Sequence, residues 1–341
     1  MSKQKFFSVL LLLLFSMLFI SGCSIKLPMF SSEPVQISDL PPEALYIDEE
    51  AIYNRTSALI QSAQSSIYIQ QAEFDDPGLI QLLLSKSRAG VEVRIILDQW
   101  QNVNQATLEQ FKSHNVSIHY YPAQKGQINH TKYLIIDQEK AMIYGPSWTA
   151  DGFRAHDLAV ELSGKSAWRT ATLFSNDWRA TTTLSLSVPK TTTLPDDNVT
   201  LAANVNVKQQ LIKQISAAAQ SIRIELSKLS DPDPEIIQAL IDAADEGLDV
   251  QLILGREVTG NTLQTLDKLR TNNVLIRYFP NQTALGMHLA IFDDSTFILT
   301  SSDWTRSSFI MNHEFSITVP SPTASAKLAE MFTQDWGKST E

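Results

Sequence analysis

The sequence predicts an α/β fold in which two duplicated sandwich domains form a pseudo-twofold pair. Internal repetition is the first reason, because residues 66–69 and 89–97 are matched, in the same order, by residues 221–224 and 246–254. Within each copy, short β-branched runs alternate with segments of helical periodicity, which is typical of βα units. The chain has 341 residues, of which 43% are hydrophobic, enough to build a core in two domains.

Each copy is expected to run strand, helix, strand, helix, strand. Acids and prolines at residues 75–77 and 231–235 precede the first helix of each copy. Acidic side chains accept hydrogen bonds from the free N–H groups of a first turn, and proline already has a helical φ. Gly90 and Gly247 then end these helices, and near-continuous apolar strands follow.

The N-terminus has the pattern of a secretory leader. Lys3 and Lys5 precede an apolar stretch, residues 6–20, that is too short to span a bilayer comfortably. The stretch ends in Ile-Ser-Gly-Cys, which resembles a bacterial lipobox, so we expect Cys23 to become the lipid-modified first residue after cleavage. An uncleaved anchor followed by a buried thiol is the alternative.

Lipid attachment at Cys23 predicts an exported protein anchored to the cell envelope. Because Ser24 and not aspartate follows the cysteine, a Gram-negative host would send it to the outer membrane. Cys23 is the only cysteine, so the fold must form without an intrachain disulfide. Without the leader the chain has 25 basic and 37 acidic side chains, a net charge of −12, which disfavours nucleic acid as a partner.

The predicted organisation has five segments. A threonine-rich stretch with Pro189 and Pro195 shows no helical period and separates the two copies. The segments are a leader (1–22), a tether (23–44), a first domain (45–180), a linker (181–204) and a second domain (205–341).

One short motif carries candidate chemistry. His130, Lys132 and Asp137 have the spacing H-x-K-x4-D, and residues 133–136 between them form an apolar, strand-like run. Because residues two apart on a strand point to the same side, we expect the side chains of His130 and Lys132 to lie on one face, where they could bind a phosphate group together.

The second copy carries a damaged version of this motif. Aligning the two apolar strands places Gly286 at the position of His130, His288 at that of Lys132 and Asp293 at that of Asp137. An alternative register keeps His288 as the motif histidine but shortens the strand by two residues. We favour the first register because it needs no deletion.

Duplication, motif and the tryptophan that follows each motif together resemble the phospholipase D superfamily over nearly the whole mature chain. This resemblance implies that two copies build one active site without a metal or cofactor. It implies that His130 attacks phosphorus, Lys132 stabilises the phosphoryl oxygens and Asp137 orients the strand end. The family's second histidine protonates the leaving oxygen, and His288 is the remaining candidate for that task.

The resemblance also implies supporting residues. The family commonly continues with G-S-x-N-W-T, to which residues 144–149 and 300–305 correspond in part. Asp157 and Glu314 stand where the family has an acid that fixes a histidine tautomer. The supporting candidates are Ser147, Asp157, Asp293, Ser301, Asp303 and Glu314. Trp148 and Trp304 recur in both copies, which favours core packing.

Three functions follow as hypotheses. The first is an envelope-anchored phosphodiesterase or phosphatidyltransferase that acts on phospholipid and forms a phosphohistidine. The second is a pseudoenzyme that binds anionic headgroups, since the second motif has lost its histidine and lysine. The third is a nuclease of the same superfamily, against which the acidic charge counts. We expect a monomer with an internal pseudo-dimer, and no zinc-like histidine spacing is present in the sequence.

Overall fold

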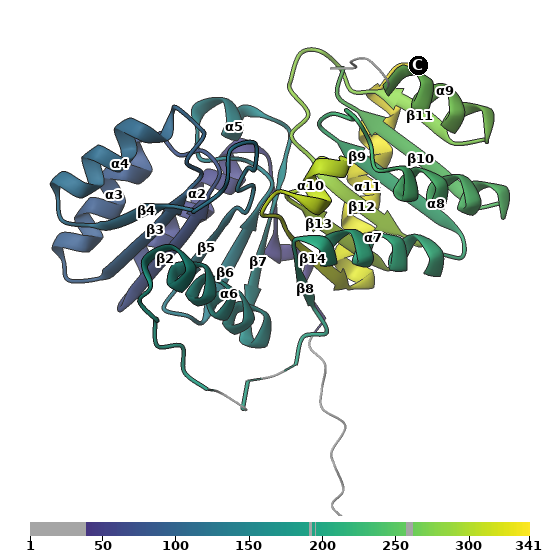
Figure 1. Ribbon diagram of the computed structural model, residues 1–341. Helices are drawn as coiled ribbons and strands as arrows, with labels where there is room; N and C mark the ends of the chain where they lie inside the picture. Colours follow the sequence, from purple (N-terminus) through teal and green to yellow (C-terminus); the bar gives the residue numbers. More distant parts are fainter. Residues whose placement is uncertain (1–38, 191–192, 195, 257–261) are drawn as a thin grey trace, which may run out of the picture. The chain divides into compact units, whose positions relative to one another are not determined.

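Two seven-stranded sheets with the same strand order build the structure, a computed structural model that describes residues 39–190, 193–194, 196–256 and 262–341. The predicted leader, Cys23 and most of the tether lie outside the described residues. Among the residues described, no helix is both long enough and apolar enough to cross a membrane. The expected α/β fold with two repeats is confirmed (Figure 1).

The first repeat contains one 3₁₀ helix, five α-helices and the first sheet. Its elements are η1 (Pro42–Ala44), β1 (Leu45–Ile47), α2 (Asp48–Ser62), β2 (Ser66–Gln71), α3 (Pro77–Arg88), β3 (Glu92–Leu97), α4 (Asn104–Ser113), β4 (Ser117–Tyr120), β5 (Tyr133–Ile136), β6 (Lys140–Tyr144), α5 (Ala150–Arg154), β7 (Leu158–Ser163) and α6 (Gly164–Thr182). The sheet order is β1-β7-β6-β5-β2-β3-β4, with β2, β3 and β4 parallel.

The second repeat follows the same plan. Its elements are β8 (Thr200–Ala203), α7 (Val205–Ala217), β9 (Ser221–Leu226), α8 (Pro234–Asp245), β10 (Asp249–Leu254), α9 (Thr262–Thr271), β11 (Leu275–Tyr278), β12 (His288–Phe292), β13 (Thr296–Thr300), α10 (Arg306–Ile310), β14 (Phe315–Pro320) and α11 (Pro322–Lys338). Read from the equivalent edge, the order is β8-β14-β13-β12-β9-β10-β11. Each strand of one repeat thus has a counterpart in the other.

The helix boundaries follow the chemistry expected from the sequence. The Asp76 side chain accepts a hydrogen bond from the backbone N–H of Leu79 at the start of α3, and Asp233 caps α8 in the same way. Beyond the ends of these helices, Gly90 and Gly247 have φ values of 91° and 95°, a left-handed conformation that glycine adopts without a Cβ clash.

One strand lies where the sequence predicted a linker. β8 pairs antiparallel with β14 and forms the edge of the second sheet, although residues 181–204 were assigned to the linker. A four-residue edge strand is too short to show a clear alternation of apolar and polar residues, so periodicity gives no signal for it.

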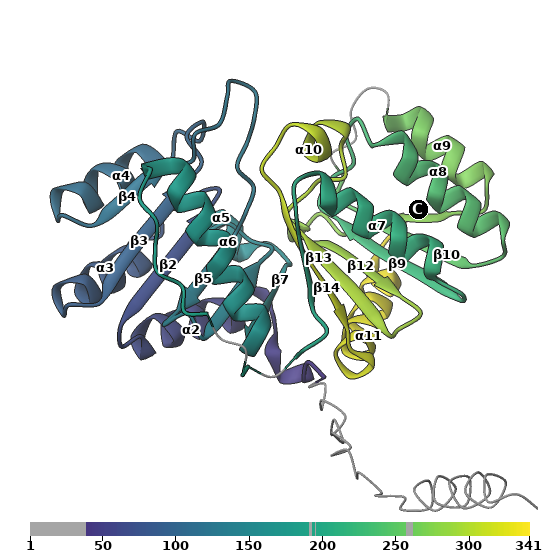
Figure 2. The ribbon, with the colours of Figure 1, turned by 60° about the horizontal axis from the view of Figure 1, so that its bottom comes forward.

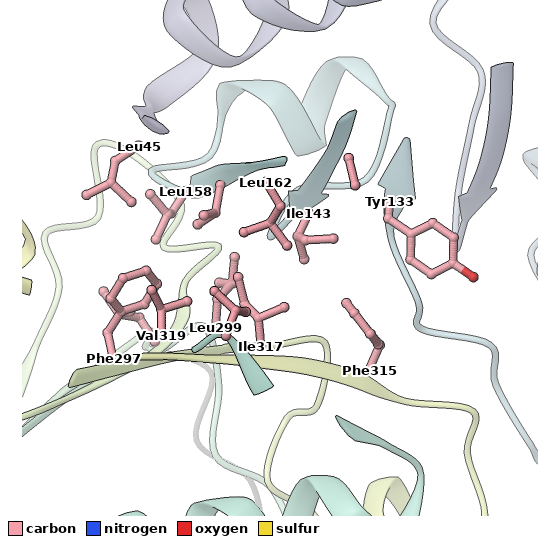
Figure 3. Packing of buried hydrophobic residues seen from close by; sticks show 14 of the residues in the cluster. Leu45, Tyr133, Ile143, Leu158, Leu162, Phe297, Leu299, Phe315, Ile317 and Val319 are labelled. Carbon is pink, nitrogen blue, oxygen red and sulfur yellow. The ribbon is translucent and has the colours of Figure 1, made fainter. Parts of the chain in front are cut away.

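The inner faces of both sheets share one hydrophobic core. This cluster also includes apolar residues of α6 and α11, whereas α2, α3 and α4 cover the outer face of the first sheet and α7, α8 and α9 that of the second (Figure 2). Figure 3 shows Leu158 and Leu162 of the first repeat facing Leu299 and Ile317 of the second. Each fully buried aliphatic side chain contributes about 1.5–3 kcal/mol, so the contact between the repeats belongs to the core of the protein.

Candidate active site

His130 lies immediately before β5, at the contact between the two repeats. Its backbone N–H donates to the carbonyl oxygen of His313 at 2.9 Å. The second repeat makes the reciprocal contact, in which the N–H of Gly286 donates to the carbonyl oxygen of His156, also at 2.9 Å. Because the two contacts are equivalent, the repeats are related by a pseudo-twofold axis near His130 and Gly286.

Strand pairing fixes the register of the damaged motif. Leu134 of β5 and Ala290 of β12 pair with equivalent residues of β2 and β9. His130 therefore corresponds to Gly286 and Lys132 to His288, as in the register that the sequence favoured. The second motif has lost its histidine and has a histidine in place of its lysine.

Glu314, from the other repeat, holds the His130 ring. The Nδ1 atom of His130 lies 2.7 Å from Oε1 of Glu314, whose side chain is fully buried, while 20% of the His130 side chain is exposed. The Ser301 hydroxyl donates to Oε2 of Glu314, and the Asn312 amide donates to Oε1 at 3.3 Å. Burial lowers the pKa of His130, but the charge and hydrogen bond of Glu314 outweigh it, so the pKa is raised.

His288 forms a second polar cluster at the start of β12. Its Nε2 lies 2.7 Å from Oδ1 of Asp303 and 3.0 Å from the hydroxyl of Ser227. Lys228 Nζ lies 3.2 Å from Oδ2 of Asp303. Burial raises the pKa of Asp303, but His288, Lys228 and the nearby His130 lower it well below its ordinary value. The influence of His130 on this carboxylate indicates that both histidines face the same region.

Asp157 occupies the place of the missing imidazole. Its fully buried carboxylate lies against Gly286 and Gly145: a Cβ atom at Gly286 would be 2.5 Å from Oδ2. Burial raises the pKa of Asp157 to about 6, although the charges of Lys132 and His288 lower it. Lys132 and His288 thus lie within electrostatic range of one acid, and Lys132 also acts on His130.

Two predicted site residues lie away from this cluster. Asp137 accepts hydrogen bonds from the backbone N–H groups of residues 64–66, and Asp293 does the same for residues 219–221. These bonds outweigh burial and lower the pKa of both carboxyl groups. The two aspartates connect strand ends, as expected for Asp137. Ser147 is partly buried, and its side chain has no hydrogen bond among the described residues.

Sequence reasoning missed Ser227 and Lys228. Both follow β9, and Lys228 stands where the first repeat has Glu73. The charge reversal at this position was the one available signal. A surface pocket of about 320 Å³ is lined by Ser227, Lys228 and Leu285, directly beside the His288 cluster.

This arrangement combines a tautomer-fixed imidazole, two lysines and a second imidazole with an aspartate partner. A fixed imidazole can attack an electrophile, lysines can stabilise anionic oxygens, and the second imidazole can exchange a proton. None of these steps requires a metal ion. Possible metal ligands elsewhere in the described residues are His156, Glu225 and Asp335.

Comparison with known proteins gives matches of two kinds. A family model described as the PLD-like domain of cardiolipin synthase matches twice, over residues 57–178 and 211–336. The structure is similar to the phosphatidylserine synthase of Haemophilus influenzae Rd KW20, with a TM-score of 0.67, 10% identity, and coverage of 89% of this chain and 88% of that one. It is also similar to the polyphosphate kinase of Porphyromonas gingivalis, with a TM-score of 0.64, 14% identity, and coverage of 85% of this chain and 46% of that one. No curated protein sequence matches the chain.

Proposed function

Since the chain belongs to the phospholipase D-like family, we propose that it is an envelope-anchored phosphodiesterase or phosphatidyltransferase that acts on phospholipid through a phosphohistidine at His130. The single observation that carries this proposal is the pairing of His130 with Glu314 across the two repeats. Glu314 accepts from Nδ1, which leaves the Nε2 lone pair to act as nucleophile.

The reaction has two displacement steps. First, Nε2 of His130 attacks phosphorus, a P–N bond forms, and the P–O bond to the leaving alcohol breaks. The released alkoxide takes a proton. Next, water or a second alcohol attacks phosphorus, gives its proton to the group that protonated the alkoxide, and breaks the P–N bond, which regenerates His130. Water gives hydrolysis and an alcohol gives transphosphatidylation.

Lysines balance the charge on the transferred phosphoryl group. Lys132 lies within electrostatic range of His130, and Lys228 supplies a second cation beside His288. Removing one such oxyanion-stabilising group from an enzyme typically slows the reaction about 10²–10³-fold.

The proton donor differs from that of the family. Gly286 leaves no imidazole at the second motif position, so His288, or a water molecule beside it, protonates the leaving oxygen in this proposal. General acid catalysis is worth about 10²–10⁴ in rate, so an imperfectly placed donor gives a slow enzyme and not an inert one.

Apolar side chains near the site support a lipid substrate. Trp100, Ile310 and Met311 are exposed, and each lies within two residues of a side chain that holds the His130 region. Trp100 follows Asp98, which accepts from the N–H of Asn129 at 2.6 Å. Such side chains suit a membrane surface, and the proposed lipid anchor at Cys23 would keep the enzyme there. The family model, described from cardiolipin synthase, agrees with this substrate class.

A second candidate is an anion-binding protein without turnover. It is favoured by Asp157, whose carboxylate fills the space at Gly286 that an imidazole would need. In that case the lysines would bind a phosphate group, and no covalent intermediate would form.

The test is release of headgroup from a labelled phospholipid in mixed micelles by the purified protein. We expect the native chain to release the headgroup and His130→Ala to abolish this release. The control is His114→Ala, which changes an exposed histidine at the C-terminal end of α4 and should leave the release unchanged. Mass spectrometry of the acid-sensitive adduct should find a phosphatidyl group on His130, because only the headgroup alcohol has left phosphorus. Turnover that survives His130→Ala would refute the assignment, and phosphate binding without any adduct would favour the second candidate.

A labelled oligonucleotide in the same assay tests the nuclease hypothesis.

A further inference from the structure

A histidine outside the proposed catalytic site is held between two carboxylates. His156 precedes β7, and its Nδ1 lies 2.6 Å from Oδ1 of Asp48. Its Nε2 lies 2.9 Å from Oδ2 of Asp335, in α11. The imidazole is stacked on Phe279 with the ring centroids 5.2 Å apart, which fixes the plane of the ring.

Glu225 of β9 completes this cluster and is the unusual member. Its side chain is fully buried, and neither carboxylate oxygen has a hydrogen-bond partner in the described part of the chain. One of its oxygens and the ligating atoms of His156 and Asp335 all lie within 4.8 Å of one another. A buried carboxylate without a partner is strongly unfavourable, and burial raises the pKa of Glu225 to about 8. A cation bound in place of the proton would also relieve this cost.

The first repeat provides an internal comparison. Gln70 stands at the equivalent position, where its amide donates to Asn129 at 3.1 Å and its oxygen accepts from the Tyr133 hydroxyl at 2.7 Å. In the second repeat Leu285 and Leu289 replace these two partners. The second repeat has therefore gained a buried carboxyl group at the position where it lost both hydrogen-bonding neighbours, which points to a ligand from outside the chain.

We propose that His156, Glu225 and Asp335 bind a divalent cation, with Nε2 of the imidazole and one oxygen of each carboxylate as ligands. The ion takes the place of the proton that His156 shares with Asp335. Asp48 accepts from Nδ1–H and so leaves Nε2 free to coordinate, the arrangement in which a carboxylate orients a metal-bound histidine. One nitrogen and two carboxylate oxygens suit Zn²⁺ or Mn²⁺, with water in the remaining positions.

Two of the three proposed ligands, His156 and Asp335, line a pocket at the surface, and the third, Glu225, lies behind them. A surface pocket of about 450 Å³ is lined by Asp48, His156, Phe279, Asp335 and Lys338, so a hydrated ion can enter without unfolding. Lys338 lies 3.3 Å from Oδ1 of Asp335, which leaves Oδ2 on the side of the histidine.

The ion would connect the two repeats. His156 belongs to the first repeat, whereas Glu225 and Asp335 belong to the second, so one coordination sphere crosses the interface between them. The site takes no part in the chemistry at His130, and this inference does not depend on the proposed function.

The experiment uses the full chain in detergent, stripped of metal with a chelator and dialysed. ZnCl₂ and MnCl₂ are titrated separately by calorimetry, and thermal unfolding is followed with and without each ion. We expect one ion bound per chain and a higher Tm in its presence. Asp48→Asn should weaken binding by about 10–100-fold and Glu225→Gln by at least that much.

Two variants make the result decisive. Glu225→Gln installs the residue of the first repeat and removes a buried carboxyl group that has no hydrogen-bond partner in the described part of the chain, so it should fold, with a Tm that no longer responds to the ion. Asp177 of the first repeat pairs with His313 of the second repeat, as Asp335 pairs with His156. Asp177→Asn alters only this equivalent pair, so the variant should bind the ion as the native chain does. Failure of the stripped native chain to bind either ion, or equal affinity in Glu225→Gln, would overturn the proposal.

Discussion

The two motif positions, His130 in the first repeat and Gly286 in the second, have the same backbone contacts and different chemistry. Both donate their N–H group to a carbonyl of the other repeat at 2.9 Å, and each faces an acid from that repeat. The carboxylate of Glu314 contacts the imidazole of His130, whereas the carboxylate of Asp157 lies directly against Gly286 and fills the space beside it. The fold has therefore kept equivalent backbone positions for two motif histidines, but only His130 has an imidazole.

The two repeats also differ at the lysine position of the motif, and a lysine from another strand end compensates for the difference. The first repeat retains Lys132, and the second has His288, whose partner Asp303 is also bound by Lys228. The cation lost from β12 is thus replaced by one from the end of β9. We infer that the first repeat carries the covalent chemistry and the second carries charge balance and proton transfer.

The largest predicted effect separates the two histidines. His130→Gln should reduce the rate of headgroup release by about 10⁴-fold or more, because it removes the nucleophile. His288→Gln should cost about 10²-fold, the lower range for a general acid that water can partly replace. Single-turnover assays at saturating lipid measure both. Equal losses would mean that the repeats share the chemistry more evenly than the geometry indicates.

The next effect compares the two lysines. Lys132→Met should slow turnover by about 10²–10³-fold, because in the proposed reaction its ammonium group stabilises the oxygens of the transferred phosphoryl group. Lys228→Met should cost less, about tenfold, since Lys228 is partly exposed and acts beside Asp303. The ratio of kcat/KM values for the two variants is the measurement, and a larger loss for Lys228 would reverse the assigned roles.

Sequence reasoning could predict what local patterns encode. The βα alternation, the duplication and the capping acids Asp76 and Asp233 each follow from neighbouring residues, and each is present in the structure. The register of the second motif was also predictable, because sliding β12 by two residues would have removed part of its apolar run from the sheet.

What the sequence could not predict depends on contacts between distant residues. Lys228 and Ser227 meet His288 because β9 and β12 are neighbours, and no spacing pattern links them. The residues of the proposed ion site, His156, Glu225 and Asp335, are likewise far apart in the chain. The expectation that no metal is bound rested on the absence of local histidine spacing, which such a site does not need.

A smaller predicted effect tests how tightly Asp157 closes the second motif position. Gly286→Ala places a Cβ atom 2.5 Å from Oδ2 of Asp157 and should destabilise the protein by about 1–3 kcal/mol, the usual range for overpacking. Gly337→Ala is the matched control, because no atom lies within 4 Å of its Cβ and alanine favours the helix by up to about 1 kcal/mol. Urea unfolding should therefore move in opposite directions for the two variants. A neutral Gly286→Ala would indicate that Asp157 is free to withdraw.

The smallest predicted effect is a shift of the pH profile. The pKa of His130 is raised by Glu314, and only the neutral ring can attack, so kcat/KM should fall as the pH drops through this raised value. Glu314→Gln keeps a hydrogen-bond acceptor but removes the charge, so the pKa of His130 should fall and the acid limb should move to lower pH. Asp157→Asn changes the equivalent acid, which faces Gly286 and not the ring of His130, and should leave this limb in place. An acid limb that moves with Asp157 and not with Glu314 would show that the pair of Asp157 and Gly286, and not the pair of Glu314 and His130, governs the pH dependence.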